Sequence, residues 1–445
     1  MPKITHRKKR LSSFKLIVLG FAGVIVLGAL ILMLPFSSTA GVVTPFHEAL
    51  FTSTSAVCVT GLVVQDTGSY WSAFGQTVIL LLIQIGGLGV VTVAALFAML
   101  SGRKISLMQR STMQDAISAP KVGGIVRLTR FIVRGTFLIE LIGMIVMLPT
   151  FCGNYGIKGI WMAAFHSVSA FCNAGFDILG TAENKYPSLT GYIGNPAINI
   201  TIMLLIIVGG IGFLTWDDIY TNKWHFKKYR MQSKVILVTT AILIIVPAVF
   251  FFFCDFTGLP LAERILASLF QSVTPRTAGF NTADLSAMTG SSKAIMTLLM
   301  LVGGSPGSTA GGMKTTTLAV LILSAFSVCR KKDDAEVCGR RIDGSVVKNA
   351  AAVAVMYFLL FFVGGIVIST VEGLPLSTCL YETASAVGTV GLTLGITPQL
   401  GVLSQLILIV LMYLGRVGGL TLIYAAVSNK NQSGAKLPLE KITVG

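Results

Sequence analysis

Four short stretches of this sequence place a glycine where backbone carbonyls could bind a cation. The octamers SAVCVTGL (55–62), SAFCNAGF (169–176), VTPRTAGF (273–280) and SAVGTVGL (385–392) each hold Gly in the seventh place. Those glycines are separated by 114, 104 and 112 residues, an even spacing that chance would not produce. Because Gly adopts φ > 0 readily, it lets neighbouring carbonyl oxygens face one way, as a carbonyl site for K⁺ requires.

The residues at and just before each glycine are the candidate ion-binding residues, whose carbonyls could hold a metal cation. Such a site needs oxygens aimed inward at successive levels and little side-chain bulk at the turn. Helices ending at the loops would add the negative ends of their dipoles, about −0.5 charge each. The candidate residues are Val59, Thr60, Gly61, Asn173, Ala174, Gly175, Thr277, Ala278, Gly279, Thr389, Val390 and Gly391.

The composition places the chain in a lipid bilayer. Hydrophobic residues make up 53% of the 445 positions and charged residues 12%, whereas soluble domains carry about a quarter charged residues. The stretches 16–34 and 402–427 reach the ~20 apolar residues that cross a hydrocarbon core of ~30 Å. The first stretch is too long for the apolar region of a signal peptide, and no clear cleavage motif follows it. We therefore expect a retained first helix and a multi-pass protein of the cytoplasmic membrane.

The net charge of +16 has a topological explanation rather than a nucleic-acid one. Basic residues cluster before the first span and in the stretches 103–134, 223–234, 330–348 and 430–441. Each cluster follows an even number of expected spans, so all of them fall on one side of the membrane. This bias predicts that both termini lie in the cytoplasm. A basic inner surface that docks an acidic partner protein is the alternative.

A repeated unit surrounds each octamer. Helix-compatible segments at 45–57, 159–171, 261–273 and 376–387 precede the loops and are too short to cross a membrane. A full-length apolar span comes before each segment, and another span follows each loop, which gives eight spans in all. Non-helical backbone at membrane depth survives only inside protein or along a watery cavity. The four loops should therefore meet on one axis.

These repeats predict an all-α integral membrane protein with four tandem outer helix–pore loop–inner helix units around a pseudo-fourfold pore. The expected boundaries are 1–118 with Gly61, 119–228 with Gly175, 229–340 with Gly279, and 341–445 with Gly391 and a short cytoplasmic tail. A pair of glycines marks each inner helix, at 86–87, 209–210, 303–304 and 418–419. Close helix packing is the alternative role for these pairs.

The third inner segment is interrupted by a stretch that we interpret as a gate. It holds five Gly and one Pro in ten positions, and these residues cost about 1 and 3 kcal/mol in a helix interior. We expect the other three inner helices to run unbroken, which favours a specialised role; a plain connection between two half-spans is the alternative. The residues concerned are Gly303, Gly304, Ser305, Pro306, Gly307, Ser308, Thr309, Ala310, Gly311 and Gly312.

Arg416 is the one charge expected deep in the fourth inner helix. An isolated Arg in a membrane is costly, so a functional role is the default hypothesis. The residues two places before the other three glycine pairs are Gln84, Ile207 and Leu301. Only the fourth unit therefore carries a charge at this position. We expect Arg416 to face the cavity below the loops as an electrostatic barrier or gate latch. Pairing with a helix-end carbonyl is the alternative.

Two further cations lie near the loops. Arg276 cannot point into a K⁺ pathway without repelling the ion, so we expect it behind the third loop. There it would bond to carbonyls or to an acid, with Glu48, Glu263 and Glu382 as candidates. Lys314 follows the Gly-rich stretch and would meet an acidic group or extend toward water.

On these features the chain resembles the Trk/Ktr/HKT superfamily of potassium transporters, and most closely its bacterial KtrB branch. The resemblance covers almost the full length and rests on the four units, the glycine in each loop and the Gly-rich break in the third unit. The tripeptide TVG at 389–391 also resembles the start of the TVGYG filter of potassium channels.

The resemblance carries several implications for function. Gly in all four loops implies a preference for K⁺, and the 303–312 stretch would be a gate loop under the selectivity filter. The family also implies a homodimer of two separate pores on a cytoplasmic, nucleotide-binding, KtrA-like regulatory ring. The chain itself shows no GxGxxG or GKT-type site. Stimulation by Na⁺ is left open.

Other function classes have less support in the sequence. A secondary transporter of another cation or a small solute would need polar groups clustered mid-membrane, and the spans offer little beyond Glu140, Asp217, Asp218 and Arg416. A membrane enzyme would need a catalytic cluster, but the four His are scattered. The seven Cys lack metal-type pairing. We therefore predict no catalytic residues, no covalent cofactor, lipids as neighbours and no nucleic-acid partner.

Overall fold

The computed structural model describes residues 13–101, 105–117, 123–419 and 421, so the basic N-terminal stretch and the tail at 430–441 lie outside the described residues. The helices of the first half are α1 (Ser13–Leu32), α2 (Phe46–Val57), α3 (Ala73–Leu88), α4 (Val90–Leu100), α5 (Leu107–Ile117), α6 (Ile125–Tyr155), α7 (Lys158–Phe171), α8 (Pro196–Gly210) and α9 (Phe213–Asn222). The second half has α10 (Met231–Cys254), α11 (Leu261–Val273), α12 (Gly290–Leu301), α13 (Thr315–Cys329), α14 (Gly344–Glu372), α15 (Leu376–Gly388) and α16 (Val402–Val417).

Short elements complete the described structure. Single 3₁₀ turns lie at Pro35–Ser37, Thr190–Tyr192, Phe226–Lys228 and Thr397–Gln399. Strands β1 (Glu336–Val337) and β2 (Arg340–Arg341) pair as a small antiparallel hairpin between α13 and α14. The hairpin is the only sheet in the described residues, so the predicted all-α class holds apart from it.

The same order of elements occurs four times along the chain. A long outer helix (α1, α6, α10 or α14) packs against a short helix (α2, α7, α11 or α15), and an inner segment follows. The short helices begin and end within one residue of the predicted segments. Each long helix is long and apolar enough to cross a membrane. The prediction of a helical membrane protein with a fourfold repeated order is therefore confirmed.

The inner segments differ from the prediction of eight full spans. Helices α3 and α4 meet at an angle of 96°, and α8 and α9 at 98°, while α12, α13 and α16 are shorter apolar helices. Gly89 and Gly212 occupy the two bends with φ of 85° and 91°, a region that L side chains rarely adopt. The expectation that only the third inner segment is broken is wrong, because a single glycine suffices to bend the first and second.

A glycine lets each short helix approach its outer helix in three of the repeats. In the first repeat, Ser53 Oγ donates to the Ile25 carbonyl at 2.7 Å, and Gly28 lies one turn further along α1. Ser167 with Gly143 and Thr383 with Gly364 repeat this arrangement. The third repeat departs from it, because Gln271 takes the place of the hydroxyl residue and its side-chain amide has no partner among the described residues.

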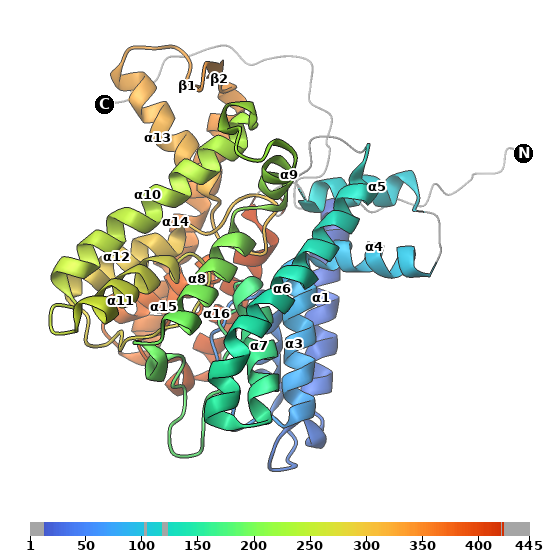
Figure 1. The fold of residues 1–445 in the computed structure, drawn as a ribbon, viewed down its shortest axis with the longest axis vertical. Helices are drawn as coiled ribbons and strands as arrows, with labels where there is room; N and C mark the ends of the chain where they lie inside the picture. Colours follow the sequence, from blue (N-terminus) through green and yellow to red (C-terminus); the bar gives the residue numbers. More distant parts are fainter. Residues whose placement is uncertain (1–12, 102–104, 118–122, 420, 422–445) are drawn as a thin grey trace, which may run out of the picture.

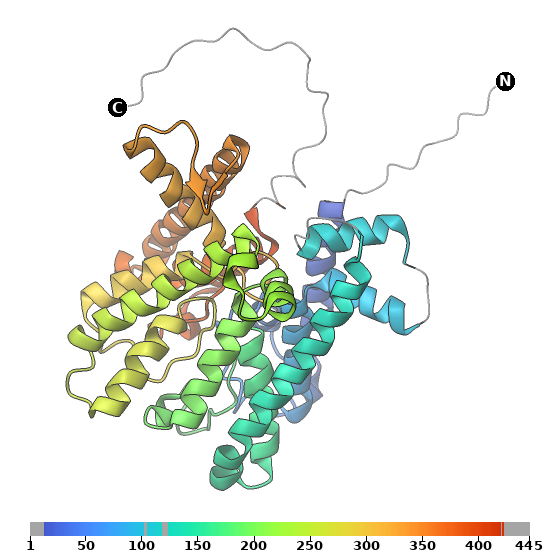
Figure 2. The ribbon, with the colours of Figure 1, turned by 45° about the horizontal axis from the view of Figure 1, so that its top comes forward.

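The basic stretches gather at one end of the molecule. Figure 1 places α5, α9, the start of α10 and the β1–β2 hairpin together at the top, above the bundle of long helices. Figure 2 shows α4 and α5, in cyan, projecting sideways from that end. The described basic clusters therefore share one face, as the predicted charge bias requires.

Replacing Gly143 should destabilise the fold at the crossing of α6 and α7. A Cβ atom there would lie 2.6 Å from Ser167 Oγ and 2.8 Å from a Leu205 methyl group. We expect Gly143→Val to lower the free energy of unfolding by about 1–3 kcal/mol, the usual cost of overpacking. Thermal unfolding of the purified protein in detergent measures this. Gly153→Val is the control, because Gly153 lies on the same helix with nothing within 4 Å; equal losses in both variants would contradict the packing argument.

Candidate functional site

The four glycine loops, at 59–61, 173–175, 277–279 and 389–391, close into a ring. At each of these glycines, the position of a missing Cβ atom is blocked by a backbone carbonyl oxygen of the next repeat. Gly61 faces the carbonyl of Ala174, Gly175 that of Ala278, Gly279 that of Val390, and Gly391 that of Thr60. The ring therefore joins segments from the whole length of the chain and leaves no room for a side chain at its four glycines.

The backbone of the glycine loops is left-handed at two positions in each repeat. The glycines have φ between 69° and 93°, as the sequence predicts. The residue two places earlier also has positive φ: 50° at Val59, 59° at Asn173, 70° at Thr277 and 52° at Thr389. Three of these are β-branched, for which this conformation is strained. Such strain persists only where the surroundings enforce it, and it is common at functional sites.

Hydroxyl groups at the ends of the short helices hold the glycine loops in place. The Gly61 and Gly391 amides each donate to a serine Oγ at 3.0 Å, and two other hydroxyls donate to the carbonyl just after the glycine. The four hydroxyl residues are Ser55, Ser169, Thr274 and Ser385. The sequence analysis did not single them out, although Ser opens three of the four octamers and would have been the signal.

Arg276 lies behind the third loop, but its partner differs from the prediction. The side chain is 5% exposed, and Nη2 donates to Thr240 Oγ1 at 3.3 Å. Carbonyls or an acid were expected as partners, whereas the partner here is a hydroxyl; Glu48 accepts from Gln65, and Glu382 from Thr393 and Thr397.

Asn173 occupies the place in the second loop that Thr or Val takes in the others. Its side-chain amide lies 3.1 Å from Thr277 Oγ1 of the third loop and 3.4 Å from Thr309 Oγ1 of the 303–312 loop. Asn173 therefore links two of the glycine loops to the segment beneath them.

The 303–312 loop crosses the molecule directly beneath the ring. Its amides donate to carbonyls of other repeats, with Ser305 bonded to Gly210 at 2.9 Å and Gly312 to Gly415 at 3.2 Å. The Thr389 side chain blocks the position of a Cβ on Gly311, so the loop touches the fourth glycine loop from below. Several of its backbone polar groups are thus paired inside the protein, as irregular structure at membrane depth requires.

Arg416 ties the 303–312 loop to the first repeat. One guanidinium nitrogen donates to the Thr309 carbonyl, and the other donates to the carbonyls of Gly86 and, at 3.3 Å, Gly87 at the end of α3. The partner carbonyls therefore include both a helix end and the interrupted segment, and the role of Arg416 as a gate latch stays a prediction.

The structure also corrects the register of the fourth repeat. Gly86, Gly209 and Gly415 occupy matching places, because the last-turn carbonyl of a short helix blocks the Cβ position of each one. Gly418 caps α16 with φ of 87° and matches the bends at Gly89 and Gly212. The counterparts of Arg416 are therefore Gly87 and Gly210, not Gln84 and Ile207. The sequence analysis had aligned Gly418 and Gly419 with the other glycine pairs because they, too, are two consecutive glycines.

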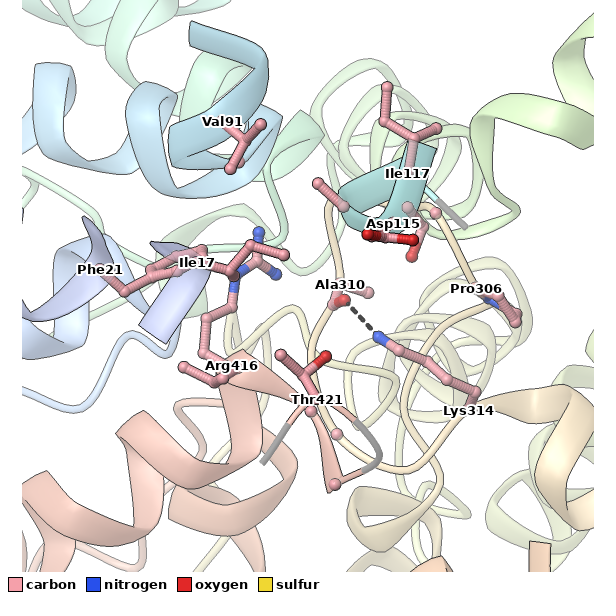
Figure 3. Close-up of a pocket in the computed structure, with 18 of the residues that line it drawn as sticks. Ile17, Phe21, Val91, Asp115, Ile117, Pro306, Ala310, Lys314, Arg416 and Thr421 are labelled. Atoms are coloured by element: carbon pink, nitrogen blue, oxygen red, sulfur yellow. Dashed lines mark hydrogen bonds between the residues drawn. The ribbon is translucent and has the colours of Figure 1, made fainter. Parts of the chain in front are cut away.

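A cavity of about 290 Å³ opens beneath the 303–312 loop. Figure 3 shows Arg416 and Lys314 on either side of Ala310, with Asp115 of α5 lining the same cavity. Lys314 Nζ donates to the carbonyls of Ala310 at 2.8 Å and Gly311 at 3.2 Å. Its charge is thus held by the loop itself rather than by an acid. Burial raises the pKa of the Asp115 carboxyl above its usual value.

Helix α5 also closes on the loop from outside. The carbonyl of Ile117, the last residue of α5, blocks the position of a Cβ on Gly307. The cavity is bordered by α1, the α3–α4 bend, the end of α5 and the end of α16. The end of α5 is therefore in direct steric contact with the 303–312 loop.

Comparison with known proteins identifies this arrangement. A family model described as TrkH, cation transport protein, matches residues 13–434. The chain belongs to the TrkH family. The resemblance to Trk and Ktr proteins noted in the sequence is thereby confirmed.

Relatives within the TrkH family cover nearly the whole chain. The potassium/sodium uptake protein NtpJ of Enterococcus hirae is 39% identical over 98% of both chains. The Ktr system potassium uptake protein B of Bacillus subtilis is 37% identical over 97% of this chain and 96% of that one. The potassium transporter TrkH of Vibrio parahaemolyticus has a similar structure, with a TM-score of 0.74 over 96% of this chain and 87% of that chain, at 19% identity. This structural match shows a shared TrkH fold.

Proposed function

We propose that this TrkH-family protein takes up K⁺ across the cytoplasmic membrane through a carbonyl selectivity filter formed by the four glycine loops. The closed ring of glycines carries the proposal. Alternating left-handed residues turn successive carbonyls of a loop toward one side, and four such loops around one axis surround a dehydrated ion with oxygen ligands. The short helices end at the ring, so their negative dipole ends favour a cation there.

The relatives support K⁺ as the ion. The names of the Bacillus subtilis and Vibrio parahaemolyticus proteins specify potassium, whereas that of the Enterococcus hirae protein specifies potassium and sodium. All four loops of this chain carry Gly, which leaves room at each of them for a backbone carbonyl of the neighbouring loop. We infer that K⁺ permeates and that Na⁺ acts, if at all, as a stimulating ion.

The 303–312 loop and Arg416 form the proposed gate. The loop lies under the fourth glycine loop and bonds to the second and fourth repeats, while Arg416 extends the connection to the first. A guanidinium charge below the filter also repels K⁺. The closed state is therefore maintained by a set of hydrogen bonds that a conformational change would have to break.

The proposed assembly includes partners beyond this chain. The Bacillus subtilis relative is named protein B of a Ktr system, and we infer a homodimer on a cytoplasmic, nucleotide-binding, KtrA-like ring. The basic face with the described clusters would be cytoplasmic, with both termini on that side. The four units would have the boundaries 1–118, 119–228, 229–340 and 341–445. The protein is a transporter and not an enzyme.

A coupled secondary transporter is the second candidate, and one buried cluster favours it. The Glu140 side chain is 5% exposed within α6. Its carboxylate lies 3.4 Å from Gln84 Nε2 and 4.0 Å from Cys172 Sγ, next to the second glycine loop. Ionisable groups inside a membrane commonly belong to coupled transport pathways.

Flux with separate ion gradients distinguishes the two candidates. In vesicles that contain the purified protein, we expect K⁺ to move down its own gradient when no Na⁺ gradient is present. A carbonyl filter needs no second ion to pass K⁺. Isotope or dye measurement of K⁺ entry tests this expectation. Flux that stops without an inward Na⁺ gradient would instead favour coupled transport.

Replacing Gly391 should abolish K⁺ uptake. A side chain at this position would meet the Thr60 carbonyl and must adopt φ of 93°, so the ring cannot close around an ion. We expect Gly391→Val to lose the rescue of growth at low external K⁺ in a strain without its own uptake systems. Gly191→Val is the control, since Gly191 has nothing within 4 Å. Rescue by Gly391→Val, with normal amounts of protein in the membrane, would count against the filter.

Removing the Arg416 side chain should increase K⁺ flux. Arg416→Ala loses the bonds to Thr309 and Gly86, and each charged hydrogen bond contributes about 1.5–3 kcal/mol. A closed-to-open equilibrium would shift by about tenfold or more. Vesicle flux measures this shift, with Arg264→Ala as control because Arg264 bonds to Phe252 on another helix. Unchanged flux in Arg416→Ala and in a deletion within 303–312 would exclude the gate.

A further inference from the structure

A second cavity lies between α1, α4 and α5, separate from the proposed pore. Its volume is about 400 Å³. Apolar residues form most of its lining, with Gly20 of α1 and Ala94 and Ala98 of α4 giving it depth. Ser106, just before α5, and Gln109 and Thr112 of α5 add polar groups to the lining. The groove is therefore apolar along α1 and α4, with polar and apolar side chains mixed along the α5 side.

The groove lies near the start of the first membrane span. Leu16 and Gly20 belong to the first two turns of α1, so they lie within about 10 Å of the helix start at Ser13. Helix α4 leaves α3 at 96° and carries no charged residue, and its Phe97 is 65% exposed. An apolar helix turned across the bundle at this depth fits the boundary between headgroups and acyl chains.

Basic side chains lie on one helix that borders the groove and on a helix that packs beside it. Arg110 is exposed on α5, one residue after Gln109 of the groove wall. Arg127, Arg130 and Arg134 are exposed along one face of α6, which packs against both α4 and α5. Asp115, the acid of α5, lines the gate cavity instead. The described charges at this end thus favour an anionic ligand.

We propose that this groove binds an anionic phospholipid. An acyl chain lies against Gly20, Ala94 and Ala98, and the headgroup phosphate faces Arg110 and the arginines of α6. A protein segment fits less well, because a helix about 10 Å in diameter would overfill 400 Å³ within two turns. The depth, the narrow apolar wall and the adjacent positive charge all suit a lipid.

The bound lipid would also touch the α3–α4 bend, which borders the cavity beneath the proposed gate. Val90 and Val91, the first residues after the bend at Gly89, line both this groove and the cavity under the 303–312 loop. An acyl chain in the groove therefore supports the first turn of α4 from the side opposite the gate cavity. If the proposed function holds, K⁺ flux should rise or fall with the fraction of anionic lipid.

Lipid retention tests the site without reference to transport. The full-length protein is purified from vesicles of phosphatidylcholine and phosphatidylglycerol at equal fractions, and native mass spectrometry counts the lipids that remain bound. We expect preferential retention of phosphatidylglycerol, lost in Ala98→Trp because the indole fills the groove. Leu96→Trp is the control, since Leu96 lies on α4 outside the groove lining. Ala98→Leu replaces the Trp variant if that one does not fold.

The headgroup contact has its own variant. Arg110→Gln should weaken phosphatidylglycerol retention about fivefold, the factor given by about 1 kcal/mol per basic residue at an anionic surface. Arg340→Gln, an exposed arginine of the β1–β2 hairpin, is the control. Equal retention of both lipids by the wild type, or unchanged retention in Ala98→Trp, would overturn the proposal. So would a change in dimer fraction without a change in bound lipid, which would assign the groove to a second copy. Absence of K⁺ flux in the wild type and in all variants would contradict the proposed function and would leave the lipid site unaffected.

Discussion

The structure depends on one constraint, which is that irregular backbone at membrane depth must find its hydrogen-bond partners inside the protein. Lipid tails offer none, and each unpaired amide or carbonyl is costly. Serine hydroxyls of the short helices accept the amides of Gly61 and Gly391. The 303–312 loop bonds to carbonyls of the second and fourth repeats, and Arg416 donates to carbonyls in the last turn of α3. The loops can therefore exist only as one assembled unit.

Glycine meets three different needs in this fold, each through the missing Cβ atom. In the ring, Gly61 and its equivalents let backbone from adjacent repeats touch. At helix crossings, Gly28 and Gly143 admit the hydroxyls of the short helices. At Gly89 and Gly212, positive φ turns the inner segments by nearly a right angle. Missing Cβ atoms therefore permit both the close contacts of the ring and the sharp turns of the inner segments.

The four repeats are alike in order but differ in the parts around the ring. The third repeat has Gln271 in place of the hydroxyl residue, uses Thr274 to hold its loop, and carries the 303–312 loop. The fourth has Arg416 where the first and second have Gly87 and Gly210. Arg416 and the 303–312 loop meet under the ring. A regular scaffold thus supports an irregular lower layer, where proposed gating is concentrated.

The sequence by itself determined the helical membrane class, the four short helices to within a residue, and the four glycines, because apolar length and internal repetition are local properties of a chain. It did not determine the bends at Gly89 and Gly212, since one glycine in an apolar run is compatible with a straight helix. The hydroxyl partner of Arg276 and the register of Arg416 were also decided only by tertiary structure. Both depend on contacts between segments tens to hundreds of residues apart, which no local pattern encodes.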